Sequence, residues 1–283
     1  MKLIKPTSGQ KFIIKPTPEW PEIVFETDAK GDHTWNWSIS WGKYRMAGRV
    51  ITKENRWDAR PVVTNYGGLL TVQVQAGKEP ALTTRVKILG ENPTIDEAKN
   101  YLALTLRKQG LENIVKGLDK IITHESKFKN FTVIKEPIKT FDHGYGLCQL
   151  TTPPPTYGQV WNWRLNIEAG IKLYLQKRAE AVAYLGKNGR AYTDEQLMYE
   201  IVNRYNGGVY HIWDSKAGKW ERPSKILCDT QTGNIGWNMT DKENAGKTEA
   251  ELHKRDSQSY KHPPGKDAHW RYYGVCYAEA ILD

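Results

Sequence analysis

The sequence has no long apolar run, and its first residues contain no apolar core. A helix that spans a membrane needs about 20 predominantly apolar residues, so we predict no membrane span. A secretory signal peptide also needs a short apolar stretch near the N-terminus, which residues 1–10 lack. We therefore expect a protein that stays in the cytoplasm, leaves the cell by another route, or belongs to a longer chain.

Cysteine and histidine are scarce, and neither forms a metal-binding pattern. The three cysteines, Cys148, Cys228 and Cys276, have no metal-ligand spacing and are odd in number. Cys228 and Cys276 are able to pair in an oxidising compartment, but the sequence does not show whether they do. The seven histidines contain no His-x-x-x-His or similar set, so we predict no catalytic metal and no cofactor.

The sequence also lacks a run of lysine or arginine, although its net charge is +9. Its basic residues are scattered among acidic ones, which is not typical of a nucleic-acid-binding patch. The same positive field attracts the anionic polymers of a cell envelope. We therefore favour an envelope partner and predict no nucleic-acid partner.

The first 92 residues show the alternation of apolar and polar residues that is typical of strands. The clearest run extends from Trp35 to Trp41, where every second residue is apolar. Further strands are predicted at 70–76 and 86–88, with turns at 29–32 and 65–68. Several short strands without a helical period predict a β-sandwich-like domain over residues 1–92. The tryptophan row is expected to lie in the core, and a sugar-binding face is the alternative.

The spacing of apolar residues changes at residues 92–94. Thr94 and Glu97 form the pattern of a capping box, which predicts a helix that ends near Gly110. Thr193 and Gln196 form a second capping box. We therefore predict an α+β chain in which a mainly α-helical domain, residues 93–283, follows the β domain.

The C-terminal extension of this domain, from about residue 209, carries no motif. Residues 241–264 are polar and are predicted to form a long loop. Residues 270–282 are predicted to form a terminal helix that packs back on the domain.

Glu125 continues an apolar stripe. Four apolar residues precede it at steps of three, four and three: Leu111, Ile114, Leu118 and Ile121. The next step of four reaches Glu125, which predicts a carboxylate on the apolar face of a helix. Apolar packing raises the pKa of a carboxyl group, which suits a general acid. The alternative is that the helix ends here and the carboxylate points into water. No other carboxylate is expected at a comparable position.

Four short blocks occur in a defined order over about 85 residues. They are Glu125-Ser126, Gly144-Tyr145-Gly146-Leu147-Cys148-Gln149, Asn166-Ile167-Glu168-Ala169-Gly170 and Tyr205-Asn206-Gly207-Gly208. In order and spacing they resemble the lysozyme-like superfamily of soluble lytic transglycosylases and goose-type lysozymes. That pattern runs Glu-Ser, Gly-Leu-Met-Gln, Asn-Ile-x-x-Gly and Tyr-Asn-x-Gly. The resemblance covers roughly residues 94–208 and implies a lysozyme-like fold there.

The resemblance implies that Glu125 is the catalytic acid. It also implies substrate contacts for five residues: Ser126, Tyr145, Gln149, Tyr205 and Asn206. The amide of Gln149 suits sugar hydroxyls and N-acetyl groups, and the alternative is a polar residue that closes a local turn. The same resemblance implies that Tyr205 contacts Glu125 or the sugar. The alternative is a capped and buried tyrosine.

Other residues of the blocks have local interpretations. Gly146 is expected to let the backbone approach a ligand closely, and Gly144 to supply a positive φ. Cys148 replaces the usual methionine of the family and is interpreted as a buried packing residue. Asn166 is interpreted as the N-cap of the helix that follows.

The resemblance implies cleavage of the β-1,4 bond between N-acetylmuramic acid and N-acetylglucosamine in peptidoglycan. A lysozyme uses a second carboxylate to position water, whereas a lytic transglycosylase closes a 1,6-anhydro ring on the muramyl sugar. Asp142 is the candidate second carboxylate, because its surroundings resemble those in goose-type lysozymes. Capping of its own glycine turn is the alternative. Hydrolase and transglycosylase therefore both remain open.

An exported antibacterial effector fits an enzyme of this kind without a signal peptide. It would act in the periplasm or cell wall of a target bacterium, after delivery by a type VI-like secretion machine. Its partners would be peptidoglycan strands, a cognate immunity protein and a component of the secretion machine. The alternatives are a non-catalytic peptidoglycan-binding module and a structural component of a phage or secretion machine. Residues 1–92 are expected to have a wall-binding or adaptor role.

Overall fold

The computed structural model describes residues 1–141 and 143–283. The chain contains both helices and sheets, so the prediction of a mixed α and β protein is confirmed. Contacts divide it into two compact units: residues 1–109 with 125–170, and residues 110–124 with 171–283. These ranges differ from the predicted domains, residues 1–92 and 93–283.

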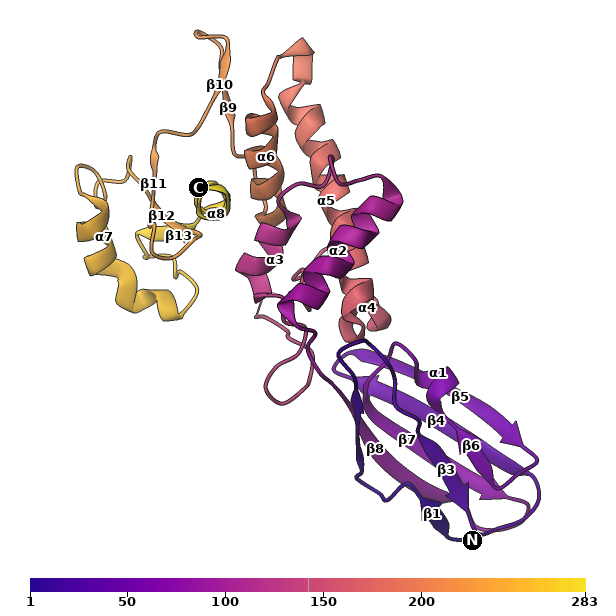
Figure 1. Cartoon of the computed structure of the whole chain (residues 1–283). Coiled ribbons are helices and arrows are strands. Elements are labelled where there is room, and N and C mark those ends of the chain that lie inside the picture. Colours follow the sequence, from indigo (N-terminus) through magenta and orange to yellow (C-terminus); the bar gives the residue numbers. More distant parts are fainter. Residues whose placement is uncertain (142) are drawn as a thin grey trace. The chain divides into compact units, whose positions relative to one another are not determined.

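A five-stranded sheet forms the framework of the first unit (Figure 1). In spatial order its strands are β2 (Lys11–Ile14), β8 (Leu82–Gly90), β7 (Gly68–Ala76), β4 (His33–Trp41) and β5 (Tyr44–Thr52). β2 pairs with β8 in parallel, and the other pairs are antiparallel. The strands predicted from alternation are confirmed, because β4, β7 and β8 contain the predicted segments.

A second, three-stranded sheet packs on the first. It consists of β1 (Leu3–Lys5), β3 (Val24–Thr27) and β6 (Arg56–Asp58), in the order β1-β3-β6. The ring of Trp35 on β4 lies 6.4 Å from Phe25 and 5.9 Å from Trp57, measured between centroids. Trp35 and Ile39 are fully buried between the sheets, so their assignment to the core is confirmed.

Three short or medium helices and the start of a long one complete the first unit. They are α1 (Arg60–Val63), α2 (Ile95–Gln109), α4 (Tyr157–Trp161) and the first part of α5 (Trp163–Leu185). The capping box of α2 is confirmed, because the Glu97 N–H donates to Thr94 Oγ1 at 3.1 Å and the Thr94 N–H donates to Glu97 Oε2 at 2.8 Å. Gly110 follows α2 with a φ of +65°, as the predicted helix end requires.

The second unit combines helices with two small sheets. Its elements include most of α3 (Leu118–Ser126), the end of α5, η1 (Lys187–Gly189), α6 (Asp194–Asn206), α7 (Glu249–Asp256), η2 (Ser257–Lys261) and α8 (Gly274–Leu282). The sheets are the pair β9 (Ile212–Asp214) and β10 (Lys219–Glu221), and the triplet β11 (Ile226–Cys228), β12 (Ile235–Asn238) and β13 (Trp270–Tyr272). The capping box of Thr193 with Gln196 is confirmed at the start of α6.

The prediction that the apolar stripe before Glu125 begins at Leu111 is wrong. α3 starts at Leu118, directly after Gly117, whose φ is +78°. Ile114 therefore lies outside the helix and is 38% exposed. Leu118 and Ile121 are buried and remain at helical spacing from Glu125.

The C-terminal extension is more ordered than its polar sequence indicates. The predicted long loop contains α7 and η2, so this prediction is wrong; α7 opens with a capping box of Thr248 and Glu251. Trp237, Leu252 and Trp270 belong to a small core beneath it. The terminal helix is confirmed as α8, which begins at Gly274, later than predicted.

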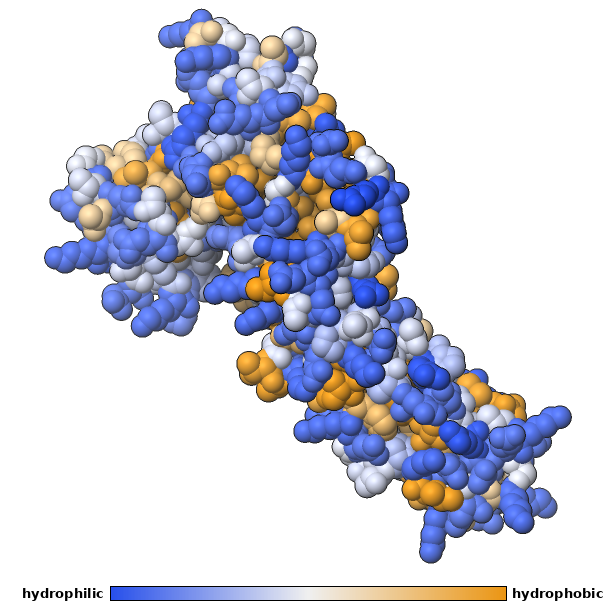
Figure 2. Space-filling view, in the orientation of Figure 1, coloured by the Kyte–Doolittle hydropathy of each residue, from blue (hydrophilic) through white to orange (hydrophobic). Residues whose placement is uncertain are grey.

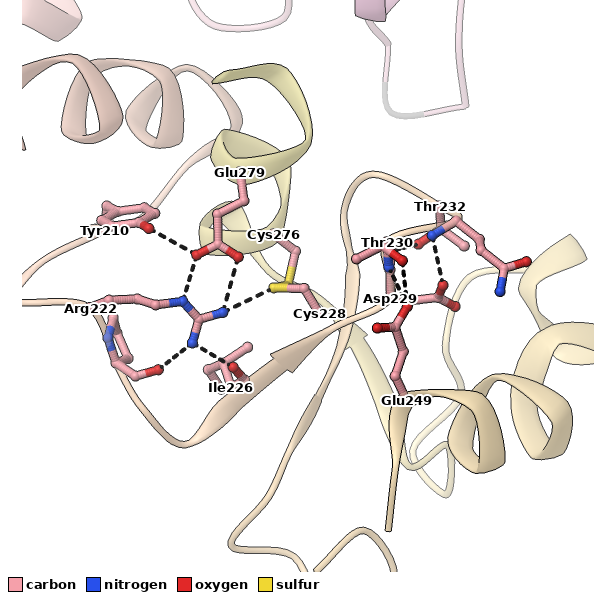
Figure 3. The surroundings of a disulfide bond; sticks show 12 residues. Tyr210, Arg222, Ile226, Cys228, Asp229, Thr230, Thr232, Glu249, Cys276 and Glu279 are labelled. Carbon is pink, nitrogen blue, oxygen red and sulfur yellow. Dashed lines mark hydrogen bonds and ion pairs between the residues drawn. A yellow bond between two sulfur atoms is a disulfide. The ribbon is translucent and has the colours of Figure 1, made fainter. Parts of the chain in front are cut away.

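A disulfide between Cys228 and Cys276 joins β11 to α8 (Figure 3). Beside it, Arg222 Nε donates to Glu279 Oε1 at 2.5 Å and Arg222 Nη2 donates to Oε2 at 3.0 Å. The Tyr210 hydroxyl donates to Glu279 Oε1 at 2.8 Å. A covalent bond and a bidentate ion pair therefore anchor the last helix.

Hydrophilic residues cover most of the face drawn in Figure 2, and apolar residues occur there in small groups. None of the helices in the described chain combines the length and apolar character needed to cross a bilayer.

Candidate functional site

Glu125 and Ser126 form the end of α3 and belong to the first unit. Both residues are half-buried. The Ser126 hydroxyl donates to the Leu147 carbonyl oxygen at 2.8 Å. The block that contains Glu125 is therefore tied directly to the block that contains Gly146 and Gln149.

The backbone is strained directly after Glu125-Ser126. Lys127 and Phe128 have φ values of +53° and +58°, in the left-handed region that non-glycine residues rarely adopt. Such a conformation costs on the order of 1–3 kcal/mol per residue and persists only where packing enforces it. Phe128 is 1% exposed, so burial of its ring supplies that packing.

Strain is concentrated in this part of the chain. Seven non-glycine residues in the described ranges have a positive φ, and five of them lie between residues 127 and 149: Lys127, Phe128, Lys135, His143 and Gln149. Residues in sparsely populated backbone regions cluster at active sites and ligand clamps. The segment from the end of α3 to Gln149 is thus the strongest structural candidate for a functional loop.

The two glycines of this loop lie where no side chain fits. Gly146 has a φ of +71°, and a Cβ there would lie 2.4 Å from Asn166 Nδ2 and 2.6 Å from Asn130 Oδ1. A Cβ on Gly144 would lie 2.6 Å from Gln149 Oε1. Gly144 is not among the glycines with positive φ, so that prediction is wrong. Side chains of the protein itself lie close to Gly146. The structure therefore shows protein side chains at the position where the sequence predicted a ligand.

Asn166 holds the loop from the side of α5, so its interpretation as an N-cap is wrong. It is fully buried inside the first turns of α5, which begins at Trp163. Its Oδ1 accepts from the Cys148 N–H at 2.9 Å, and its Nδ2 donates to the Tyr145 and Gln159 carbonyl oxygens, both at 3.1 Å. The side chain of Asn162 takes the capping role instead, because its Oδ1 accepts from the Arg164 N–H at 3.0 Å.

Asn92 holds the same loop nearer its start. Its Oδ1 accepts from the backbone N–H groups of Asn130 and Phe131 at 2.7 and 2.8 Å, and its Nδ2 donates to the Phe131 carbonyl oxygen at 2.8 Å. The sequence offered no local signal for this role, because the partners are far apart along the chain.

Gln149 is half-buried and has a φ of +45°. Its Nε2 donates to the Gly146 carbonyl oxygen at 2.7 Å, and its Oε1 accepts from the Thr140 hydroxyl at 3.0 Å. The turn-closing alternative is therefore what the structure shows. The amide nitrogen carries a second hydrogen and the amide oxygen a second lone pair.

The other residues of the glycine block are buried. Cys148 is 0% exposed, in agreement with its interpretation as a packing residue. Tyr145 is 3% exposed, and its ring lies 6.2 Å from Trp41 and 5.9 Å from Tyr44. Burial, followed by the effect of Tyr145, raises the pKa of Tyr44 to about 12, so its hydroxyl stays neutral at physiological pH.

Three further residues belong to the predicted site: Asp142, Tyr205 and Asn206. Asp142 lies outside the described residues. Tyr205 and Asn206 form the end of α6 in the second unit, where Tyr205 is half-buried and Asn206 is exposed. Gly207 ends that helix as predicted, with a φ of +103°.

Glu200 is a carboxylate that is buried more deeply than the half-buried Glu125. Glu200 on α6 is 0% exposed, and its Oε2 accepts from the backbone N–H groups of Tyr210 and His211, both at 3.1 Å. Its Oε1 lies 2.9 Å from Arg204 Nε. The i,i+4 spacing to Arg204 is the sequence signal that identifies this pair. These partners assign Glu200 to the anchoring of the chain after α6.

No protein-family model matches the chain, and no curated protein matches it.

Proposed function

We propose that this protein cleaves the β-1,4 bond between N-acetylmuramic acid and N-acetylglucosamine in peptidoglycan. The observation that carries the proposal is the hydrogen bond of 2.8 Å from Ser126 to the Leu147 carbonyl oxygen. It joins the Glu125 block to a strained loop that presents an amide side chain, Gln149. Acid-catalysed glycoside cleavage needs a general acid and preorganised polar groups, and this bond ties the segment that carries Glu125 to such a loop.

In this proposal Glu125 donates a proton to the leaving glycosidic oxygen. The resulting oxocarbenium-like transition state is then captured by water or by the muramyl 6-hydroxyl. Water gives a reducing end and uses Asp142 to position it. The 6-hydroxyl gives an anhydro sugar, and Glu125 acts next as the base. Gln149, Tyr145, Ser126, Tyr205 and Asn206 would orient the sugar.

The proposed architecture is a β-sandwich-like part followed by a lysozyme-like helical part. Two facing sheets that share the core around Trp35 support the first assignment. The second rests on the order of the four sequence blocks and on the helices α2, α3, α5 and α6 that carry or flank three of them.

The disulfide supports an extracytoplasmic place of action, because disulfides form and persist in oxidising compartments. We therefore infer an exported antibacterial effector, carried by a secretion machine and neutralised in the producing cell by an immunity protein. Expression directed to the bacterial periplasm should lyse cells, whereas cytoplasmic expression should be harmless. Equal toxicity in both compartments would contradict this location.

The deciding experiment is mass spectrometry of fragments released from purified sacculi. Wild-type protein should release muropeptides, with anhydro ends for a transglycosylase and reducing ends for a hydrolase. Binding to sacculi without any release would instead establish the non-catalytic peptidoglycan-binding alternative.

A further inference from the structure

A pocket of about 470 Å³ lies at the end of the five-stranded sheet, within the first unit. β4 contributes its last residue, Trp41, to it, and the turn that follows contributes Lys43. The segment between α3 and α4 contributes Glu136, Lys139, His143 and Tyr145. The pocket thus shares Tyr145 with the glycine block, while its other wall comes from the sheet.

The two aromatic rings of the pocket are held in place. The Trp41 indole N–H donates to Glu136 Oε2 at 3.2 Å, and its ring meets Trp161 edge-on at 5.9 Å. Trp41 is half-buried, so part of its surface faces solvent. Tyr145 is fixed by backbone pairing with Lys139 and Leu150. A rigid aromatic surface binds ligands with little loss of conformational entropy.

The two lysines bring positive charge to the same pocket. Lys43 Nζ lies 5.5 Å from the centre of the Tyr44 ring and 5.9 Å from that of Tyr145, which are cation–π distances. Lys139 is exposed and lies next to Tyr145 through their β-bridge. Glu136 is the carboxylate among the described lining residues, and its Oε2 already accepts from Trp41.

We infer that this pocket binds a sugar residue that carries a carboxylate. The apolar face of a pyranose ring fits the Trp41 surface, and the carboxylate pairs with the ammonium groups of Lys43 and Lys139. Glu136 accepts from a sugar hydroxyl or an amide N–H. This inference rests on the proposed function for the identity of the polymer. In peptidoglycan the carboxylate comes from the lactyl group of muramic acid or from its attached peptide.

The pocket gives the β-sheet part a role in selecting acidic over neutral glycans. Its cationic groups favour glycans that carry a negative charge. The aromatic surface does not distinguish one pyranose from another. Binding should therefore be strong for muramyl-containing fragments and weak for chitin fragments of the same length.

The test is an NMR titration in the Glu125→Gln background, which prevents cleavage of the probes. Three disaccharides are compared: N-acetylglucosaminyl-N-acetylmuramic acid with its peptide, the same disaccharide without the peptide, and chitobiose. The indole N–H signal of Trp41 reports binding at this pocket. We expect the signal to shift with one or both acidic probes and to respond weakly to chitobiose. The peptide-free probe identifies which carboxylate is recognised.

The double variant Lys43→Gln/Lys139→Gln should weaken binding of the acidic probe about 5-fold and leave chitobiose unchanged, as two partly screened ion pairs predict. Lys53→Gln/Lys78→Gln is the matched control, because both lysines are exposed, the net charge changes equally and neither residue lines the pocket. Unchanged binding in the first variant, or equal loss for all three probes, overturns the inference.

Cleavage of sacculi by the protein with an intact Glu125 is measured in parallel. Cleavage without lysine-dependent binding refutes the pocket and leaves the proposed function standing. Lysine-dependent binding without cleavage refutes the proposed function and leaves the pocket standing.

Discussion

The side chain of Asn166 accepts a hydrogen bond from the backbone N–H of Cys148 at 2.9 Å, and its amide nitrogen donates to the carbonyl oxygen of Tyr145 at 3.1 Å. One buried amide on α5 therefore sets the path of the loop that presents Gln149. The loop in turn accepts the hydrogen bond from Ser126, next to Glu125. The position of the proposed catalytic loop thus depends on a residue that need not touch substrate.

Replacement of Asn166 by alanine should destabilise the protein by about 3 kcal/mol, because buried backbone groups that lose their partners cost about 1–3 kcal/mol each. Chemical denaturation measures the change. Asn100→Ala is the control, since Asn100 is exposed on α2 and should change stability by less than about 0.5 kcal/mol. Equal effects of the two substitutions would disprove the role of Asn166.

Gly146→Ala should cost about 2–4 kcal/mol, through left-handed backbone strain and a clash with Asn166 and Asn130. Gly189→Ala is a matched control, because Gly189 has a similar φ of +72° but no atom within 4 Å of the added Cβ. The control should lose only about 1 kcal/mol from backbone strain. The difference between the two unfolding free energies isolates the clash, and the absence of a difference would contradict the described packing.

Glu125→Gln should lower the rate of sacculus cleavage by roughly 10²–10⁴, because glutamine cannot donate a proton to the leaving oxygen. Folding should be preserved, as circular dichroism would verify. Glu200→Gln should behave in the opposite way: it breaks a buried charge pair at a cost of about 3–5 kcal/mol but leaves the activity per folded molecule intact. Full activity of Glu125→Gln would show that Glu125 is not the catalytic acid.

Asp142→Asn distinguishes the two chemistries. For a hydrolase its rate should fall nearly as far as that of Glu125→Gln, since the water loses its carboxylate. For a transglycosylase the rate should change little, and mass spectrometry should find anhydro-muropeptides, one water lighter than hydrolysis products.

Removal of the disulfide should destabilise the second unit by about 2–4 kcal/mol, since the bond closes a loop between residues 48 positions apart. The comparison is between wild type and Cys228→Ser/Cys276→Ser, each with and without a reductant. The reductant should lower the denaturation midpoint of the wild type and leave the double variant unchanged. A reductant-insensitive wild type would show that the bond makes no contribution.

His124 should make the protein sensitive to mild acid. Its ring packs edge-on against Tyr277 with 5.2 Å between centroids. Desolvation by burial lowers the pKa of His124. The unfolded state, with a histidine pKa of about 6.5, therefore binds the proton first. The associated stability is present above that value and is lost as the pH falls through the lower folded-state pKa.

Urea denaturation at pH 7.5 and 5.5 checks this prediction. His124→Gln should show a smaller loss of stability between the two pH values than the wild type. His262→Gln serves as the control, because it removes a histidine that lies outside α3, directly after η2. A wild-type pH dependence in His124→Gln would refute the assignment.

The sequence by itself determined the features that depend on neighbouring residues. The capping boxes at Thr94 and Thr193 join groups three residues apart, and the alternation around Trp35 follows from strand geometry. These interactions form within a single helix or strand, so their residues identify them without knowledge of the fold. The terminal helix α8 was recognisable for the same reason.

Tertiary structure alone decided the roles that join distant segments. Asn166 precedes an apolar periodic stretch and so resembles an N-cap, but its amide is used by a loop from earlier in the chain. The predicted stripe begins at Leu111, but the positive φ of Gly117 interrupts the helix, so the helical stripe begins only after Gly117. The pocket between Trp41 and Tyr145 forms only when a strand end and a loop are brought together. Such contacts depend on the packing of the whole unit. A local sequence pattern therefore does not reveal them.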